Sequence, residues 1–233
     1  MTTSATAAMD AEAPASTQNL KRPMIALALA AAVYMLLDGL SVDGNWMAAL
    51  KIVPIGILAW QAGRHLAGTS RTLVLLALGF SAIGDVLLAV EFANHFIFGL
   101  GAFLLAQLTY AGNFLRAARR PSLCVAGRVF SILVAATLLA QQILPAAGAL
   151  ALPVTFYFVA IVTMALSAAL HRSGSSLLFA GALTFMASDA LIAINRFLDP
   201  VPLAGTWIML TYYGAQALLV YGLIRADLAE KSA

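Results

Sequence analysis

Residues 72–90 read TLVLLALGFSAIGDVLLAV, an apolar run of nineteen residues interrupted by a single charged side chain, Asp85. As a helix, a run of this length covers the hydrocarbon core of a bilayer, because each residue adds about 1.5 Å and the core is about 30 Å thick. Other backbone conformations would leave polar groups without partners in lipid, whereas a helix satisfies its own. The run therefore predicts a transmembrane helix.

Seven further apolar runs of similar length occupy most of the remaining chain. They cover Met24–Leu40, Asn45–Ala62, His95–Leu115, Val125–Leu144, Ala151–Leu170, Ser175–Ile194 and Leu203–Ile224. Glycine, proline or short polar segments separate them, and the turns at Leu40–Asn45 and Val90–His95 are short enough to join antiparallel neighbours. We expect an all-α, polytopic membrane helix bundle with about eight transmembrane helices.

Composition supports a membrane setting. The chain is 62% hydrophobic and only 10% charged, whereas a soluble domain carries about a quarter charged residues. A single cysteine, Cys124, excludes an internal disulfide, and no spacing of His, Cys, Asp or Glu indicates a metal or another cofactor. The basic residues lie between apolar spans rather than in one patch, so no nucleic-acid partner is expected. Small residues occur throughout, and the oligomeric state is therefore unknown from sequence.

The distribution of charge predicts the orientation. The loops after the first, third, fifth and seventh spans hold Asp38, Asp43, Glu91 and Asp199, with Arg196 as their only basic residue. The termini and the other loops hold Lys21, Arg22, Arg64, Arg71, Arg116, Arg119, Arg120, Arg128, Arg172, Arg225 and Lys231. Because basic loops remain in the cytoplasm, both termini should face it. The Ala-rich composition, with Arg exceeding Lys, points to a bacterial inner (cell) membrane.

One membrane domain is expected, over residues 22–226. The preceding residues 1–21 are Ala-, Ser- and Thr-rich and predict a disordered tail. They lack the basic segment, short apolar core and cleavage site of a signal peptide. Residues 227–233 predict a short cytoplasmic tail.

Two pairs of matching strings suggest an internal repeat. DVLLA begins at Asp85 and DALIA at Asp189, and the following spans contain LTYAG at 108–112 and LTYYG at 210–214. Two parallel four-helix repeats would produce this order, with Asp85 and Asp189 as symmetry mates. Chance similarity between apolar segments is the alternative.

Three ionisable residues lie inside the spans: Lys51, Asp85 and Asp189. A charge at the centre of a bilayer costs roughly 3 kcal/mol or more, so such residues are usually functional. Each lies within about 10 Å of the outer end of its helix, which predicts one shared layer and a common buried cavity. A structural Lys–Asp pair is the alternative, but it leaves one acid in surplus, which favours a function.

Polar side chains at comparable depths are candidate partners, and the histidines are weaker candidates. The polar set comprises Ser81, Gln107, Tyr110, Tyr157, Ser188, Tyr212, Tyr213 and Gln216. His65 and His171 fall in predicted loops, where solvated side chains are expected. Arg196 either extends to the membrane interface or binds a lipid phosphate.

These residues give the chain a resemblance to the YhhN family of membrane proteins, whose characterised members are lysoplasmalogenases. The shared motifs are LKIVP at 50–54, AIGDVLL at 82–88, GAFLLAQLTY at 101–110, ASDALIA at 187–193, Arg196-Phe197 and YYGAQ at 212–216. One departure is Gln107, which stands where members often carry His. Unlike His, Gln does not transfer a proton at neutral pH.

The resemblance implies hydrolysis of the vinyl ether bond of a lysoplasmalogen, giving a fatty aldehyde and glycerophosphoethanolamine or glycerophosphocholine. The chemistry needs one carboxyl held protonated and one ionised. We expect Asp85 and Asp189 to form this catalytic pair, in unassigned order. The substrate-binding residues would be Lys51, Tyr110, Ser188, Arg196, Tyr212, Tyr213 and Gln216, with Lys51 also setting the charge states. The alternatives are a small-molecule or proton-coupled transporter and a non-catalytic lipid-binding protein.

Overall fold

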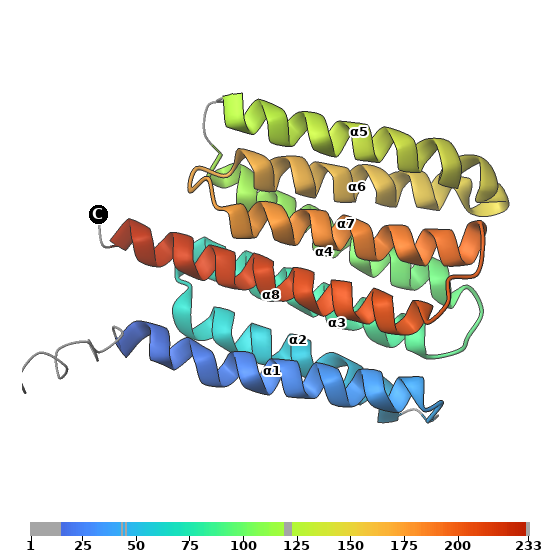
Figure 1. Ribbon diagram of the computed structural model, residues 1–233, viewed down its shortest axis with the longest axis horizontal. Helices are drawn as coiled ribbons and strands as arrows, with labels where there is room; N and C mark the ends of the chain where they lie inside the picture. The colour runs from blue at the N-terminus through green and yellow to red at the C-terminus, as the bar shows by residue number, and fades with distance from the viewer. Residues whose placement is uncertain (1–14, 43, 45, 119–122, 232–233) are drawn as a thin grey trace, which may run out of the picture.

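The computed structural model describes residues 15–42, 44, 46–118 and 123–231, which form a bundle of eight long helices (Figure 1). Their bounds are α1 Ala15–Gly39, α2 Trp46–His65, α3 Gly68–Ala89, α4 His95–Arg116, α5 Leu123–Ala146, α6 Ala151–Leu170, α7 Ser176–Phe197 and α8 Ala204–Lys231, with a 3-10 turn, η1 Gly148–Leu150, before α6. All eight are long and apolar enough to cross a membrane. The chain is therefore a multi-pass integral membrane protein, and the predicted all-α fold is confirmed.

The helix ends depart from the apolar spans mainly at the two ends of the chain. Helix α1 begins at Ala15, inside the predicted tail, and α8 continues to Lys231. The ion pairs of Lys231 with Asp227 and of Arg172 with Glu230, both at 2.5 Å, stabilise this polar extension of α8. Residues 1–14 of the predicted tail, together with Asp43, Arg119 and Arg120, lie outside the described residues.

Most helix pairs of the two predicted repeats pack in equivalent ways, but the contacts of α1 with α8 and of α5 with α7 have no comparable counterpart in the other half of the described chain. Within each half α1 packs on α2 and α5 on α6, α2 on α3 and α6 on α7, and α3 on α4 and α7 on α8. Between the halves, α4 packs on α6 and α8 packs on α2. Helices α1 and α5 lie at opposite edges of the bundle in Figure 1. The packing supports the repeat, which remains a prediction.

Glycines bring the helices of each hairpin close together. A Cβ atom at Gly84 of α3 would lie 2.6 Å from the ring of Phe103 on α4, and one at Gly99 would lie 2.6 Å from Leu88. On the other side of the bundle, a Cβ atom at Gly222 of α8 would lie 2.9 Å from Leu178 of α7. These close approaches hold the helix pairs that carry the polar residues.

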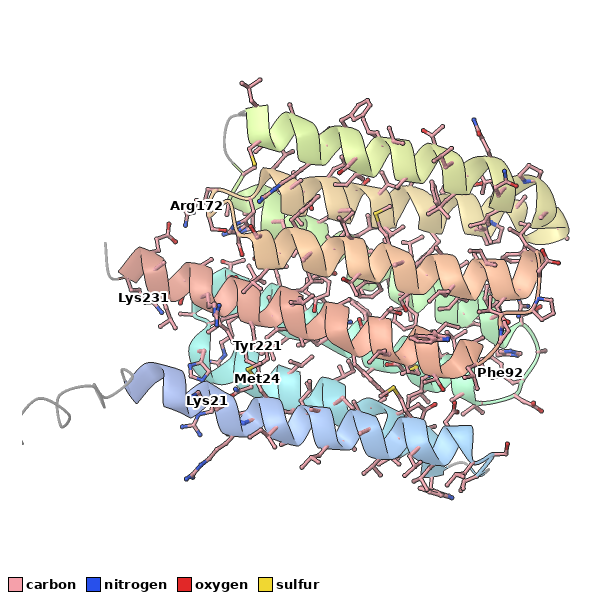
Figure 2. The ribbon with its side chains drawn as sticks, viewed as in Figure 1. Lys21, Met24, Phe92, Arg172, Tyr221 and Lys231 are labelled. Carbon is pink, nitrogen blue, oxygen red and sulfur yellow. The ribbon has the colours of Figure 1, made fainter. Side chains whose placement is uncertain are left out.

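The bundle has two ends, which differ in charge. We call the end where α1 begins and α8 ends the terminal face, and the opposite end the distal face. Figure 2 shows Lys21, Arg172 and Lys231 at the terminal face and Phe92 at the distal face. In the described part of the chain, Asp38, Glu91 and Asp199 lie at or beside the distal helix ends, and Arg64, Arg71 and Arg116 lie near the terminal ones, so the predicted difference in charge is retained.

One histidine prediction is wrong. His171, expected to be solvated, is only 6% exposed at the terminal face. Its ring packs edge-on against Phe114, with centroids 6.1 Å apart, and its Nδ1 lies 2.8 Å from the hydroxyl of Ser173. The loop folds back on α4, because Arg172 donates its backbone N–H to the carbonyl of Ala117 at 2.6 Å.

Candidate functional site

Two of the three intramembrane charges meet between α2 and α3. The ammonium of Lys51 lies 3.8 Å from Oδ1 of Asp85, and Asp85 is 2% exposed. The hydroxyl of Tyr212, on α8, donates a hydrogen bond of 2.8 Å to Oδ2 of the same carboxylate. Both carboxylate oxygens therefore have a donor or a cation nearby, which is the arrangement that a buried anion requires.

Aromatic residues extend this cluster toward the distal face. Tyr213 donates a 2.8 Å hydrogen bond to the backbone carbonyl of Lys51, which fixes α8 against α2. The ring of Tyr34, on α1, packs edge-on against Tyr213 with a centroid separation of 6.3 Å. Tyr34 also donates to Asp38, at 3.4 Å. Neither Tyr34 nor Asp38 was among the predicted site residues.

A second polar group ties three helices together deeper in the bundle. Tyr110 on α4 donates to Oε1 of Gln216 on α8 at 2.8 Å, and Nε2 of Gln216 donates to Ser81 on α3 at 3.0 Å. All three side chains are fully buried. Because both amide atoms of Gln216 are occupied, this group holds α3, α4 and α8 in register. The substrate-binding roles of Tyr110 and Gln216 remain predictions.

Asp189 has a different set of neighbours. Tyr157 on α6 donates its hydroxyl hydrogen to Oδ2 of Asp189. Nε2 of Gln107 on α4 in turn donates to the hydroxyl of Tyr157 at 3.5 Å, while Oε1 of Gln107 is buried with no partner among the described residues. Sequence reasoning placed Tyr157 near this layer but not in the site. Tyr157 lies one helix before Asp189, just as Lys51 lies one helix before Asp85. This correspondence could have identified Tyr157 as a site residue.

Ser188 points toward a neighbouring helix. Its hydroxyl donates to the backbone carbonyl of Ile208 on α8, at 3.0 Å, and the residue is fully buried. This contact joins α7 to α8 beside Asp189. The predicted role of Ser188 in substrate binding is untested.

Asp189 borders a small apolar cavity of about 50 Å³, which we call the chamber. Its lining is almost entirely hydrocarbon and comprises Leu88, Phe96, Leu100, Phe103, Val154, Tyr157, Asp189, Ile192, Ala193 and Phe197. A second apolar cavity of about 50 Å³ shares Val154, Tyr157, Asp189 and Ala193 with it, on the side of α5. The carboxyl of Asp189 therefore lies between two spaces suited to hydrocarbon.

The lining of the chamber does not include Lys51 or Asp85. Phe103 borders it and also packs edge-on against Tyr212, the donor to Asp85, with centroids 5.8 Å apart. Phe103 therefore lies between the chamber and the Asp85–Tyr212 pair. We expected all three ionisable groups around a single cavity, and the structure instead separates Asp189 from the other two by this ring.

A larger and more polar cavity of about 300 Å³ opens at the distal face, and we call it the vestibule. Its polar and charged lining residues are Tyr34, Asp38, Lys51, His95, Asn195 and Arg196. The guanidinium carbon of Arg196 lies 3.8 Å above the ring centroid of Phe96, which holds the side chain over the cavity wall. Arg196 is thus fixed by an aromatic ring rather than extended freely toward the interface.

The vestibule and the chamber are neighbours. Leu88, Phe96 and Ile192 line both of them. A charged compartment at the end of the bundle therefore adjoins an apolar one that contains a carboxyl group. An amphiphilic molecule with an anionic head and a hydrocarbon tail has the matching distribution of polarity.

The similarity of the chain to known proteins also points to a lipid-like substrate. Residues 46–223 match the model of the YhhN family. The chain is 37% identical over 179 residues to a lysoplasmalogenase of Mycobacterium bovis, covering 75% of this chain and 69% of the relative. It is 32% identical over 212 residues to lysoplasmalogenase TMEM86A of Homo sapiens, covering 84% of this chain and 86% of the relative. Lysoplasmalogenase TMEM86B of Sus scrofa is 33% identical over 190 residues, with 81% and 80% covered. No solved structure gives a significant match.

Proposed function

The chain belongs to the YhhN family, and we propose that it is a membrane hydrolase that cleaves the vinyl ether bond of a lysoplasmalogen. The products are a fatty aldehyde and glycerophosphoethanolamine or glycerophosphocholine. The observation that carries the proposal is the charged vestibule adjoining an apolar chamber that contains Asp189. The names of the relatives favour this hydrolase over a transporter or a non-catalytic lipid-binding protein.

We place the polar and apolar parts of the substrate in the cavities of matching polarity. Its phosphate lies in the vestibule, near the cationic side chains of Lys51 and Arg196. Its tail passes Leu88, Phe96 and Ile192 into the chamber and emerges among the apolar helices. The vinyl ether, which joins head to tail, then lies close to Asp189.

Asp189 acts first as the acid. It has no cationic partner among the described residues, and an ionised carboxylate is costly in an apolar cavity, so its resting form is protonated. It transfers its proton to the β-carbon of the vinyl ether, and the α-carbon and ether oxygen become an oxocarbenium ion. Tyr157 donates to Oδ2, which leaves Oδ1 to carry the proton. The acid is a catalytic residue in this scheme, and Tyr157 is a positioning residue.

Asp189, now ionised, acts next as the base. It removes a proton from a water molecule that adds to the α-carbon, and the resulting hemiacetal collapses to aldehyde and glycerol hydroxyl. Asp85, kept ionised by Lys51 and Tyr212, places a negative charge behind Phe103, which favours the cationic intermediate. No cofactor is required by this scheme.

The orientation follows from the charge distribution. We place both termini in the cytoplasm of a bacterium, in its inner (cell) membrane, because basic residues gather at the terminal face. The vestibule then opens on the outer side of that membrane.

Aldehyde release by purified Asp189→Asn and Asp85→Asn variants in detergent tests the proposal. We expect a loss of at least about 100-fold for Asp189→Asn, since general acid catalysis commonly contributes that much. Asp199→Asn, in the distal loop after α7, is the matched control and should keep its activity. Near-normal turnover by both test variants, or lysolipid recovered unchanged from the wild type, would refute the proposed hydrolysis. Labelled substrate carried unaltered into proteoliposomes would favour a transporter.

A further inference from the structure

We propose that the terminal face carries a second binding site, which takes a phosphate ester from the aqueous phase. It is a polar cavity of about 540 Å³ at the end of the bundle opposite the vestibule. The residues that line it come from the first turn of α3, the last turns of α4 and α8 and the loop between α6 and α7. They include Thr69, Ser70, Asn113, Arg116, His171 and Ser173.

The first element of the site is the N-terminus of α3. The residue before the helix is Ala67, and no side chain caps the free N–H groups of the first turn. The first backbone bond across this turn runs from the N–H of Arg71 to the carbonyl of Ala67, at 3.3 Å. Thr69 and Ser70, in the same turn, line the cavity. An uncapped helix N-terminus presents N–H donors and a partial positive charge, and both favour an anion.

The second element is Asn113, near the end of α4. The residue is 4% exposed, and its Nδ2 has no hydrogen-bond partner among the described residues. A buried amide donor is normally satisfied, because burying it unpaired is unfavourable. Asn113 lines the cavity, so an acceptor atom of a bound ligand would complete its hydrogen bonding.

The third element is an arginine without an acidic partner. Arg172 pairs with Glu230 and Lys231 pairs with Asp227, whereas Arg116 has no ion pair within the part of the chain that the structure describes. Its guanidinium is therefore available for an anion. Buried His171, bonded to Ser173, forms a firm wall beside it.

These donors define the class of ligand. An uncapped helix end, an unpaired amide and an unpaired guanidinium converge on one cavity, and the tetrahedral oxygens of a phosphate can accept from all three. The described lining residues come from the ends of α3, α4 and α8 and from the loop between α6 and α7, all at the terminal face. The cavity therefore opens at the water-facing end rather than toward the acyl chains, and it is separate from the vestibule.

Titration of purified protein in detergent with sn-glycerol 3-phosphate, followed by ³¹P NMR line broadening, tests the site. We expect saturable binding by the wild type and at least tenfold weaker binding by Arg116→Gln and Asn113→Leu. Arg64→Gln is the matched control, because Arg64 is a basic residue of the same face that lies outside this cavity. Arg116 is exposed, so its variant should fold normally even if Asn113→Leu does not.

A second arm identifies the source of the phosphate. The same titration is repeated with the protein in nanodiscs of phosphatidylcholine alone and with added phosphatidylglycerol. Binding that phosphatidylglycerol leaves unchanged supports a soluble ester, and competition by it would assign the site to a lipid headgroup instead. Equal binding by wild type, Arg116→Gln and Arg64→Gln, or no binding by any of them, would overturn the site. None of these readouts depends on aldehyde release, so the site can fail while the proposed hydrolysis stands.

Discussion

The ring of Phe103 lies so close to the backbone of Gly84 that a Cβ atom there would come within 2.6 Å of the ring carbon Cδ2. The same ring packs against Tyr212, whose hydroxyl donates to Asp85. A glycine on α3 thus determines how near an aromatic side chain of α4 can approach the buried carboxylate. The wall between Asp85 and the chamber depends on this single missing methyl group.

Gly84→Ala should therefore lower both stability and activity. The added methyl group must displace Phe103, and overpacking of this kind costs about 1–3 kcal/mol. Thermal unfolding in detergent and aldehyde release measure the two effects. Gly79→Ala, in the same helix with open space around the added carbon, is the control and should be neutral or slightly stabilising. Equal behaviour of the two variants would contradict this account of the wall.

Tyr157→Phe should slow the reaction without unfolding the protein. It removes the donor to Oδ2 of Asp189 while keeping the ring, and loss of such orientation should lower kcat by about 10- to 100-fold. Tyr221→Phe is the matched control, since Tyr221 is a buried tyrosine that lines neither the chamber nor the vestibule. The pH profile of kcat should shift in Tyr157→Phe and not in the control. A merely structural role would leave that profile in place.

Lys51 and Asp85 should show strong coupling in a double-mutant cycle. Lys51→Met leaves the Asp85 side chain, 3% exposed, without its cation, and removing one partner of a buried ion pair costs about 3–5 kcal/mol. The double variant Lys51→Met with Asp85→Asn should recover most of that stability. Chemical or thermal unfolding in detergent measures the stability of the wild type, the two single variants and the double variant. Additive effects would show that the 3.8 Å approach contributes little.

Arg196→Gln should weaken substrate binding more than it slows the chemical step. The guanidinium lies over Phe96 at the vestibule, where we place the substrate phosphate. We expect KM to rise at least about tenfold, the value of a charge-assisted hydrogen bond, with kcat within a few fold of wild type. Arg22→Gln, at the terminal face, should behave as wild type. For an alkenyl glycerol that lacks the phosphate, Arg196→Gln and the wild type should have the same KM.

His171 should make stability depend on pH. Burial, and then the neighbouring Arg172 guanidinium, lowers the pKa of His171 below its ordinary value of about 6.5. The unfolded chain then binds a proton that the folded chain resists, so stability is complete above about pH 6.5 and falls as the pH drops through that value. Thermal unfolding between pH 7.5 and 5.5 should show this loss, and His171→Gln should reduce it. Parallel curves for the two proteins would exclude His171 as the cause.

The bundle and the depth of its charges were predictable from sequence, because apolar length and axial rise determine both. The direction in which each side chain points was harder to predict from sequence. Lys51 and Asp85 meet as expected, but Asp189 turns toward Tyr157, since the rotation of α7 depends on its packing against α6 and α8. The position of Phe103 depends on Gly84, a contact between two helices that no spacing within one helix reveals. The burial of His171 likewise results from a loop folding onto α4.

In the predicted repeat the two aspartates are symmetry mates, yet Asp85 faces an amine and Asp189 a phenol. A homodimer of identical four-helix subunits would have to surround both acids with the same neighbours. A single chain that contains both halves has no such constraint, so the residues around each acid can differ. The two acids can then take different roles in a scaffold in which most helix pairs pack equivalently.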